Sequence, residues 1–172
     1  MSATDWNTPV RLAEIGQGIR RELAAGPADR ARVAESLGLA ELSRLEGSVE
    51  IAPEGRGWRL AGTVRADAVQ TCGVTLEPLP VVVDERFQVD LMEAGDPHLP
   101  PAPEEFTLET IDTPDTVEGG ALRPGAYLEE HLALALDPFP RKPGAVFEPP
   151  AAEPEPSPFA VLSRLKPRDG EG

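Results

Sequence analysis

Few side chains in this sequence have the types and spacing that catalysis requires. The two histidines are His98, in a proline-rich stretch, and His131, beside Leu132 in a segment with helical periodicity. A histidine can act as a general acid or base near neutral pH, but a half-buried structural histidine is the more common outcome at such a position. We therefore interpret His131 as structural, with a chemical role as the less favoured alternative.

The single cysteine, Cys72, is the other candidate nucleophile. It follows Thr71 without a basic residue nearby, so the sequence gives no support for a thiolate of lowered pKa. One cysteine cannot form a disulfide within the chain or a zinc site made of cysteines alone. An extended segment would place Cys72, Val74 and Leu76 on one side, which favours a strand-to-strand connection with a buried cysteine. A recognition surface on the same loop is the alternative.

Motifs for nucleotide binding or for paired catalytic carboxylates are missing. Gly16-x-Gly18 lacks the third glycine of a dinucleotide loop, and no phosphate-loop lysine follows any glycine pair. The many carboxylates have the spacing of a solvated surface. We therefore expect no enzyme activity, no cofactor and no metal.

The charge is large and unevenly distributed. The chain has 172 residues, with 16 Lys and Arg against 30 Asp and Glu, a net charge of −14. Residues 73–172 hold 20 of the acidic and 7 of the basic side chains, and residues 1–72 are close to neutral. Fourteen of the twenty prolines fall between Pro97 and Pro158. The second half is therefore expected to consist of shorter elements joined by acidic, proline-rich connectors.

No segment predicts contact with a membrane. No run approaches the ~20 consecutive apolar residues of a membrane-spanning helix. Residues 1–6 have neither the basic start nor the apolar stretch of a secretory signal. We expect a cytoplasmic protein.

Net negative charge also bears on nucleic acids, because it repels phosphate. Strong binding to naked RNA is not expected unless basic side chains of the first half gather on one face. The candidates for such a face are Arg11, Arg20, Arg21, Arg30 and Arg32. An ordinary mixed surface is the preferred interpretation of these arginines.

Periodicity predicts the elements of the first half. A short strand at 9–12 and a turn at 16–18 come first, followed by a stretch at 19–25 that could be strand or helix. A helix is expected at 27–37, where Pro27 occupies the first turn and Gly38 follows the end.

Alternating residues then predict a sheet. Strands are expected at about 45–51 and 58–69, around a glycine-rich turn, and at 79–91. Glu85 interrupts the apolar side of the last strand, which predicts a bulge or a rim position.

The period is lost from 93 to 120, where we expect a flexible acidic loop with at most a short edge strand at 106–108. A helix at 124–136 follows, whose leucines would cover the sheet while Glu129 and Glu130 face solvent. In the tail a short helix at 158–165 would dock on its own domain or on a partner. Its apolar anchors would be Phe159, Leu162 and Leu165.

These elements predict an α+β fold. A twisted antiparallel sheet, with closure towards a barrel left open, is covered by two or three helices. Residues 1–140 would form a single domain that includes the acidic loop 93–120, and 141–172 a proline-rich tail with the docking helix 158–165.

Three segments resemble one known family. They read TCGVTLEPLP at 71–80, LALALDPFPR at 132–141 and SPFAVL at 157–162. They are similar to the YceD family of large ribosomal RNA subunit accumulation proteins, in particular to its alphaproteobacterial branch. The motif positions, which are candidate recognition residues, are Cys72, Thr75, Leu76, Glu77, Pro78, Asp137, Pro138 and Arg141.

The resemblance implies a role in the accumulation or processing of 23S ribosomal RNA, with no established enzyme activity or cofactor. Many relatives have Cys-x-x-Cys in the first segment, whereas Thr75 stands at the second position here. This chain therefore lacks the complete set of ligands for any metal that those relatives bind. The first 70 residues carry no specific family motif.

Two hypotheses follow. In the first, a non-enzymatic ribosome-biogenesis factor binds a basic large-subunit ribosomal protein through the loop 93–120 and the tail 141–166, because opposite charges favour association. In the second, the chain binds structured 23S ribosomal RNA precursor directly through a local arginine face. An enzyme centred on His131 or Cys72 is a remote third.

Overall fold

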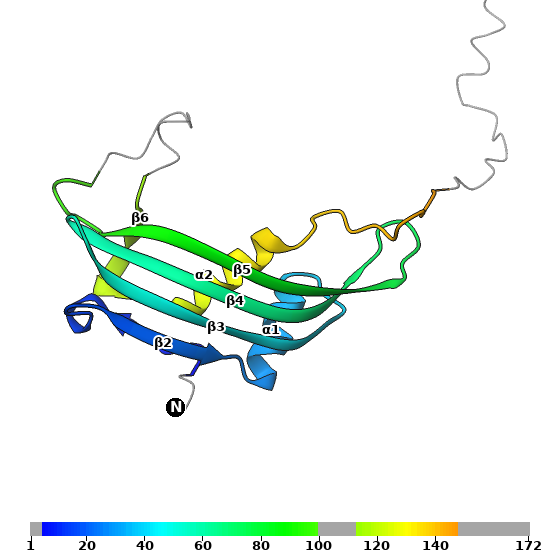
Figure 1. The fold of residues 1–172 in the computed structure, drawn as a ribbon, viewed down its shortest axis with the longest axis horizontal. Helices are drawn as coiled ribbons and strands as arrows, with labels where there is room; N and C mark the ends of the chain where they lie inside the picture. The colour runs from blue at the N-terminus through cyan, green and yellow to red at the C-terminus, as the bar shows by residue number, and fades with distance from the viewer. Residues whose placement is uncertain (1–4, 100–112, 148–172) are drawn as a thin grey trace, which may run out of the picture.

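The computed structural model describes residues 5–99 and 113–147. Their main feature is an open five-stranded sheet in the order β2-β3-β4-β5-β6 (Figure 1). The strands are β2 (Ile19–Ala24), β3 (Glu41–Glu54), β4 (Gly57–Thr71), β5 (Pro78–Glu93) and β6 (Asp115–Val117). Neighbours are antiparallel except β5 and β6, which are parallel.

Two helices and a small second sheet complete the α+β fold. Helices α1 (Pro27–Ser36) and α2 (Pro124–Ala135) contribute buried side chains to the same core as the sheet. Strand β1 (Val10–Arg11) pairs with β7 (Ala121–Leu122). The short 3-10 turn η1 (Leu12–Glu14) follows β1, and η2 (Glu118–Gly120) connects β6 to β7.

The predicted hairpin is confirmed as β3 and β4. Their pairing reaches Glu54 and Gly57, so Gly55 and Arg56 form the turn, with Gly55 at a φ of +57°. A positive φ is accessible to glycine without steric cost, which explains why the turn lies there. The undecided stretch at 19–25 is a strand, β2.

The predicted helix at 124–136 is also confirmed. Leu128 and Leu132 are fully buried, and burial of each leucine contributes about 2 kcal/mol. The helix approaches the sheet closely at Gly47, where a Cβ atom would lie 2.8 Å from both methyl carbons of Leu128. Two glycines in the sheet, Gly47 and Gly62, therefore make room for side chains that pack on it.

Glu85 occupies a rim position rather than a bulge. The register of β4 with β5 runs without a shift past Glu85, whose side chain is exposed. The irregularity of the sheet lies instead in β3, between Leu42 and Arg44.

One alternative that the sequence leaves open is decided by the structure, and one expectation needs correction. The sheet does not close into a barrel, since β2 and β6 are its two ends. The expectation of a flexible loop over 93–120 is wrong at its C-terminal end, where residues 115–120 form β6 and η2 and Val117 is buried. The sequence could not reveal β6, because three residues form a strand here only through pairing with the end of β5.

The strand considered at 106–108 and the helix at 158–165, with Phe159, Leu162 and Leu165, lie outside the described residues. In the part of the chain that is described, neither helix has the length and apolar character to cross a bilayer.

Candidate functional site

The motif positions from two distant segments meet at one end of the sheet. The loop after β4 and the segment after α2 surround Cys72, whose side chain is fully buried. The Sγ atom of Cys72 accepts hydrogen bonds from the backbone N–H groups of Thr75, at 3.4 Å, and Lys142, at 3.3 Å. We call residues 70–78 together with 137–142 the cysteine junction.

Further bonds close this junction. The N–H of Gly73 donates to the carbonyl of Pro140 at 2.9 Å, and the side-chain amide of Gln70 donates to the carbonyl of Asp137 at 2.8 Å. Lys142 Nζ lies 3.0 Å from a carboxylate oxygen of Glu77. The loop and the segment after α2 are therefore held together by both backbone and side-chain contacts.

Hydrogen bonds to the sulfur lower the pKa of the Cys72 thiol to about 6. The largest cause is the side chain of Thr75, followed by the backbone N–H groups, while burial opposes them. The sequence does not indicate a lowered pKa because it shows no basic neighbour of Cys72. The donors are a hydroxyl and backbone groups that folding brings together. The buried sulfur is a hydrogen-bond acceptor that stabilises the loop.

The outside of the junction carries apolar side chains. Leu76 is 76% exposed at a φ of +60°, and Phe139 is 77% exposed. A positive φ is strained for leucine, which indicates that the surrounding bonds hold the loop in this form. Pro78, Pro138 and Arg141 are exposed as well, so recognition by this surface stays compatible with the geometry.

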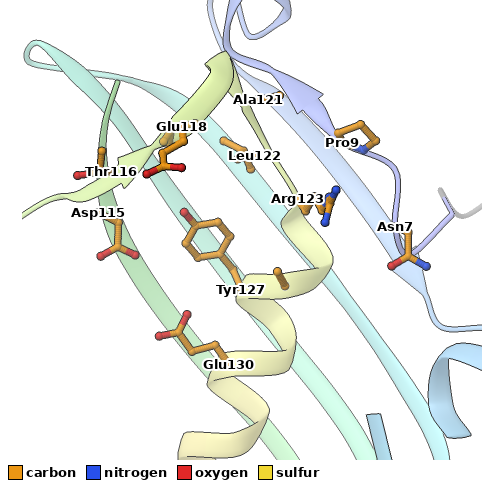
Figure 2. A pocket seen from close by; sticks show the side chains of 12 residues that line it. Asn7, Pro9, Asp115, Thr116, Glu118, Ala121, Leu122, Arg123, Tyr127 and Glu130 are labelled. Atoms are coloured by element: carbon orange, nitrogen blue, oxygen red, sulfur yellow. The ribbon is translucent and has the colours of Figure 1, made fainter. Parts of the chain in front are cut away.

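A second candidate is the large groove between β6, β7 and the first turns of α2, with a volume of about 1110 Å³. Figure 2 shows the carboxylates of Asp115, Glu118 and Glu130 on one side of it, around the ring of Tyr127. Arg123 and Asn7 lie across the groove. We call this surface the acidic groove.

Carboxylates of the acidic groove affect the pKa values of two half-buried side chains, Tyr127 and His131. Burial raises the pKa of Tyr127, and Asp115 and Glu130 raise it further. Burial lowers the pKa of His131, whereas Glu130, Glu85 and Asp115 oppose that shift. None of these three carboxylates, nor that of Glu118, forms an ion pair with another described residue.

His131 itself is packed as the preferred interpretation requires. Its ring stacks on Phe87 of β5 with 3.7 Å between centroids and 12° between planes. The Phe87 ring in turn lies over Gly62, where a Cβ atom would collide with it. The geometry therefore gives His131 a packing role.

The prediction that Glu129 faces solvent is wrong. Its carboxylate accepts a hydrogen bond of 2.6 Å from the Trp6 indole and pairs with the guanidinium of Arg32. Trp6 is 1% exposed, so this contact fixes the N-terminal segment against α1 and α2. Helical periodicity alone could not identify it, because the partners come from other segments.

The outer face of the sheet, opposite the helices, mixes arginines with carboxylates, and most of its arginines form ion pairs. It carries five arginines and eight carboxylates, namely Arg20, Arg44, Arg59, Arg65, Arg86, Glu22, Glu41, Glu46, Glu50, Glu54, Asp67, Asp84 and Asp90. Arg44 pairs with Asp67 at 2.7 Å and Arg65 with Asp84 at 3.1 Å. The five arginines proposed for an RNA face are divided among β1, β2 and α1, and two of them form ion pairs.

Comparisons with known proteins add no identification: no family model, no curated protein and no solved structure matches the chain. The resemblance to the YceD family therefore stays a prediction. Within residues 5–99 and 113–147, no group of three or more His, Cys, Asp or Glu side chains is placed to hold a metal ion.

Proposed function

We propose that this protein is a non-enzymatic ribosome-biogenesis factor that supports the accumulation and processing of 23S ribosomal RNA. It acts in the cytoplasm by binding a basic large-subunit ribosomal protein. The family is proposed from the three resembling segments, and the mode of action from the distribution of charge.

The observation that carries the mode of action is the contrast between two surfaces. On the outer sheet face, three arginines pair with carboxylates across neighbouring strands, Arg44 with Asp67, Arg59 with Asp90 and Arg65 with Asp84. In the acidic groove, the carboxylates of Asp115, Glu118 and Glu130 form no ion pair with a described residue. A basic protein segment would supply the missing charge, and complementary potentials favour both the rate and the specificity of such an encounter.

The loop between the two described ranges carries further negative charge. The loop residues Glu104, Glu105, Glu109 and Asp112 precede Asp115 directly in the chain. We propose that this loop and the tail 141–166 add contacts, with Phe159, Leu162 and Leu165 as apolar anchors.

The test is a pull-down from the native bacterium with the tagged full chain, at moderate salt, divided into RNase-treated and untreated halves. We expect one basic large-subunit ribosomal protein to stay bound after RNase treatment. The charge-reversed variant Asp115→Lys/Glu118→Lys should lose this protein, and the matched variant Glu35→Lys/Glu41→Lys, altered outside the groove, should keep it.

A different outcome would transfer the function to RNA. If 23S ribosomal RNA co-purifies and every ribosomal protein disappears with RNase, the protein-partner mechanism is wrong. The arginines of β2 and α1 then become the site to mutate.

A further inference from the structure

The border of the sheet at β5 is open over most of its length. Strand β5 has 16 residues, and on the side away from β4 only Leu91–Glu93 pair with another described strand, β6. Residues 78–90 therefore have alternate backbone N–H and C=O groups without a ladder partner among the described residues. Figure 1 shows β5 at the border of the sheet, with β6 beside one end. Pro80 within the strand agrees with an edge position.

The acidic groove adjoins this open edge. Strand β6, which lines the groove, is also the strand that pairs with the end of β5. Helix α2 also connects the groove to β5, because His131 of α2 stacks on Phe87 of β5. The His131 ring interacts electrostatically with Glu85, Asp115 and Glu130. A segment that lies along the open edge of β5 would therefore come close to Glu85, Asp115 and Glu130, which form no ion pair with a described residue.

We propose that an extended segment rich in Lys and Arg adds to β5 as a further strand. Its backbone completes the ladder along residues 81–90, and its basic side chains on one face meet Glu85, Asp115 and Glu130. Addition to a sheet edge gives affinity through backbone bonds, and alternate side chains give specificity. This inference rests on the proposed function and identifies the surface that receives the basic partner.

Charge favours such a partner over the other strands that could cover the edge. The chain's own segment 104–112 carries four carboxylates and no Lys or Arg, so pairing in cis would place like charges beside Glu85. A second copy would likewise bring its own carboxylates, including Asp90 and Glu85, to the shared edge. A basic segment avoids both repulsions.

The first test uses the full chain and a synthetic fluorescein-labelled peptide of ten residues that alternates Lys and Val. We expect fluorescence anisotropy to show saturable binding. The same peptide with N-methylated valines keeps its charge but loses backbone donors, and it should bind about tenfold more weakly. Equal binding of the two peptides would overturn strand addition.

The second test locates the charge. The variant Asp115→Asn/Glu130→Gln should weaken peptide binding about fivefold, in line with the modest strength of exposed ion pairs. The matched control Glu35→Gln/Glu41→Gln removes the same charge from α1 and the start of β3 and should bind as the unmodified protein does. An equal loss in both variants would show that only net charge matters and would overturn the proposed surface.

The third test identifies the occupant of the edge. Hydrogen exchange of the full chain should show rapid exchange of alternate amides within residues 81–90, and protection when the peptide is added. Protection of all of them in the free protein would mean that its own loop or a second copy covers the edge, and the proposal would fail. If the pull-down retains the ribosomal protein while these tests fail, the proposed function stands and this surface alone is wrong.

Discussion

The backbone N–H of Lys142 donates a hydrogen bond of 3.3 Å to the sulfur of Cys72, although the two residues are 70 positions apart in the sequence. The bond joins the segment that follows α2 to the loop between β4 and β5. Together with the contact between Lys142 and Glu77, it fixes the end of α2 against the sheet. Cys72 therefore has a structural role that a lone cysteine in a sequence does not reveal.

The first prediction concerns how the stability of the protein depends on pH because of the Cys72 thiol. The Cys72 thiol has a pKa of about 6 in the folded protein, against a usual value near 9.0. Between these pH values the unfolded chain binds a proton that the folded chain does not, so stability should rise with pH across this window. The stability that the Cys72 thiolate contributes is lost as the pH falls through 6. Urea unfolding at several pH values measures this change in stability, and the ultraviolet absorbance of the thiolate follows the titration of Cys72.

Two variants make this prediction specific. Cys72→Ser does not titrate in this range, so its stability should lack the rise. Thr75→Val removes the hydroxyl that contributes most to the lowered pKa and should move the absorbance change to higher pH. A wild-type curve parallel to that of Cys72→Ser would contradict the assignment.

A second prediction concerns the contact between Gly62 and Phe87. A Cβ atom at Gly62 would collide with the Phe87 ring, which is itself stacked against His131. Since the ring has a helix behind it, Gly62→Ala should destabilise the fold by about 2 kcal/mol. Urea unfolding measures the change. In the control Gly73→Ala, the added Cβ would meet only the carbonyl of Pro140, at 3.8 Å, and should cost far less.

The strands and helices were predictable where burial alternates clearly. Strand β4 buries Leu60, Val64 and Ala66 on one side. Such a period-2 pattern can be recognised in the sequence without any knowledge of the tertiary structure. The same reasoning located α2 from its leucines. It missed β6, whose three residues carry no measurable period.

The candidate site was predictable only in part. The resembling segments identified the residues of the cysteine junction, yet the sequence could not show that Cys72 and Lys142 touch. The acidic groove was missed because its lining comes from the N-terminal segment, β6, β7 and α2 together. Negative charge was expected in the loop, but its concentration beside Tyr127 depends on how α2 lies against β6.

A third prediction compares two adjacent glutamates on α2. Glu129 accepts a bond from Trp6 and pairs with Arg32, whereas Glu130 lines the groove and has no described ion-pair partner. Glu129→Gln should destabilise the protein by about 1 kcal/mol, because the partly buried charge pair is lost. It should also change the fluorescence of Trp6. Glu130→Gln should leave both the urea midpoint and this fluorescence unchanged, and equal effects of the two substitutions would contradict the structure.

The last prediction uses His131 to measure the field of the acidic groove. Burial against Phe87 lowers the pKa of His131 below its usual 6.5. The unfolded chain then takes up a proton more readily, so this histidine should make the protein less stable as the pH falls through 6.5. His131→Gln does not titrate and should remove that part of the pH dependence in urea unfolding.

The neighbouring carboxylates give this prediction an internal control. Glu130, Glu85 and Asp115 favour the protonated ring and so limit the shift that burial causes. Glu130→Gln should therefore lower the pKa of His131 further, as followed by the NMR shift of its ring proton. Glu35→Gln, on the exposed side of α1, should not move it. An imidazole ring that titrates at the same pH in the unmodified protein and in both variants would show that Glu130 does not act on His131.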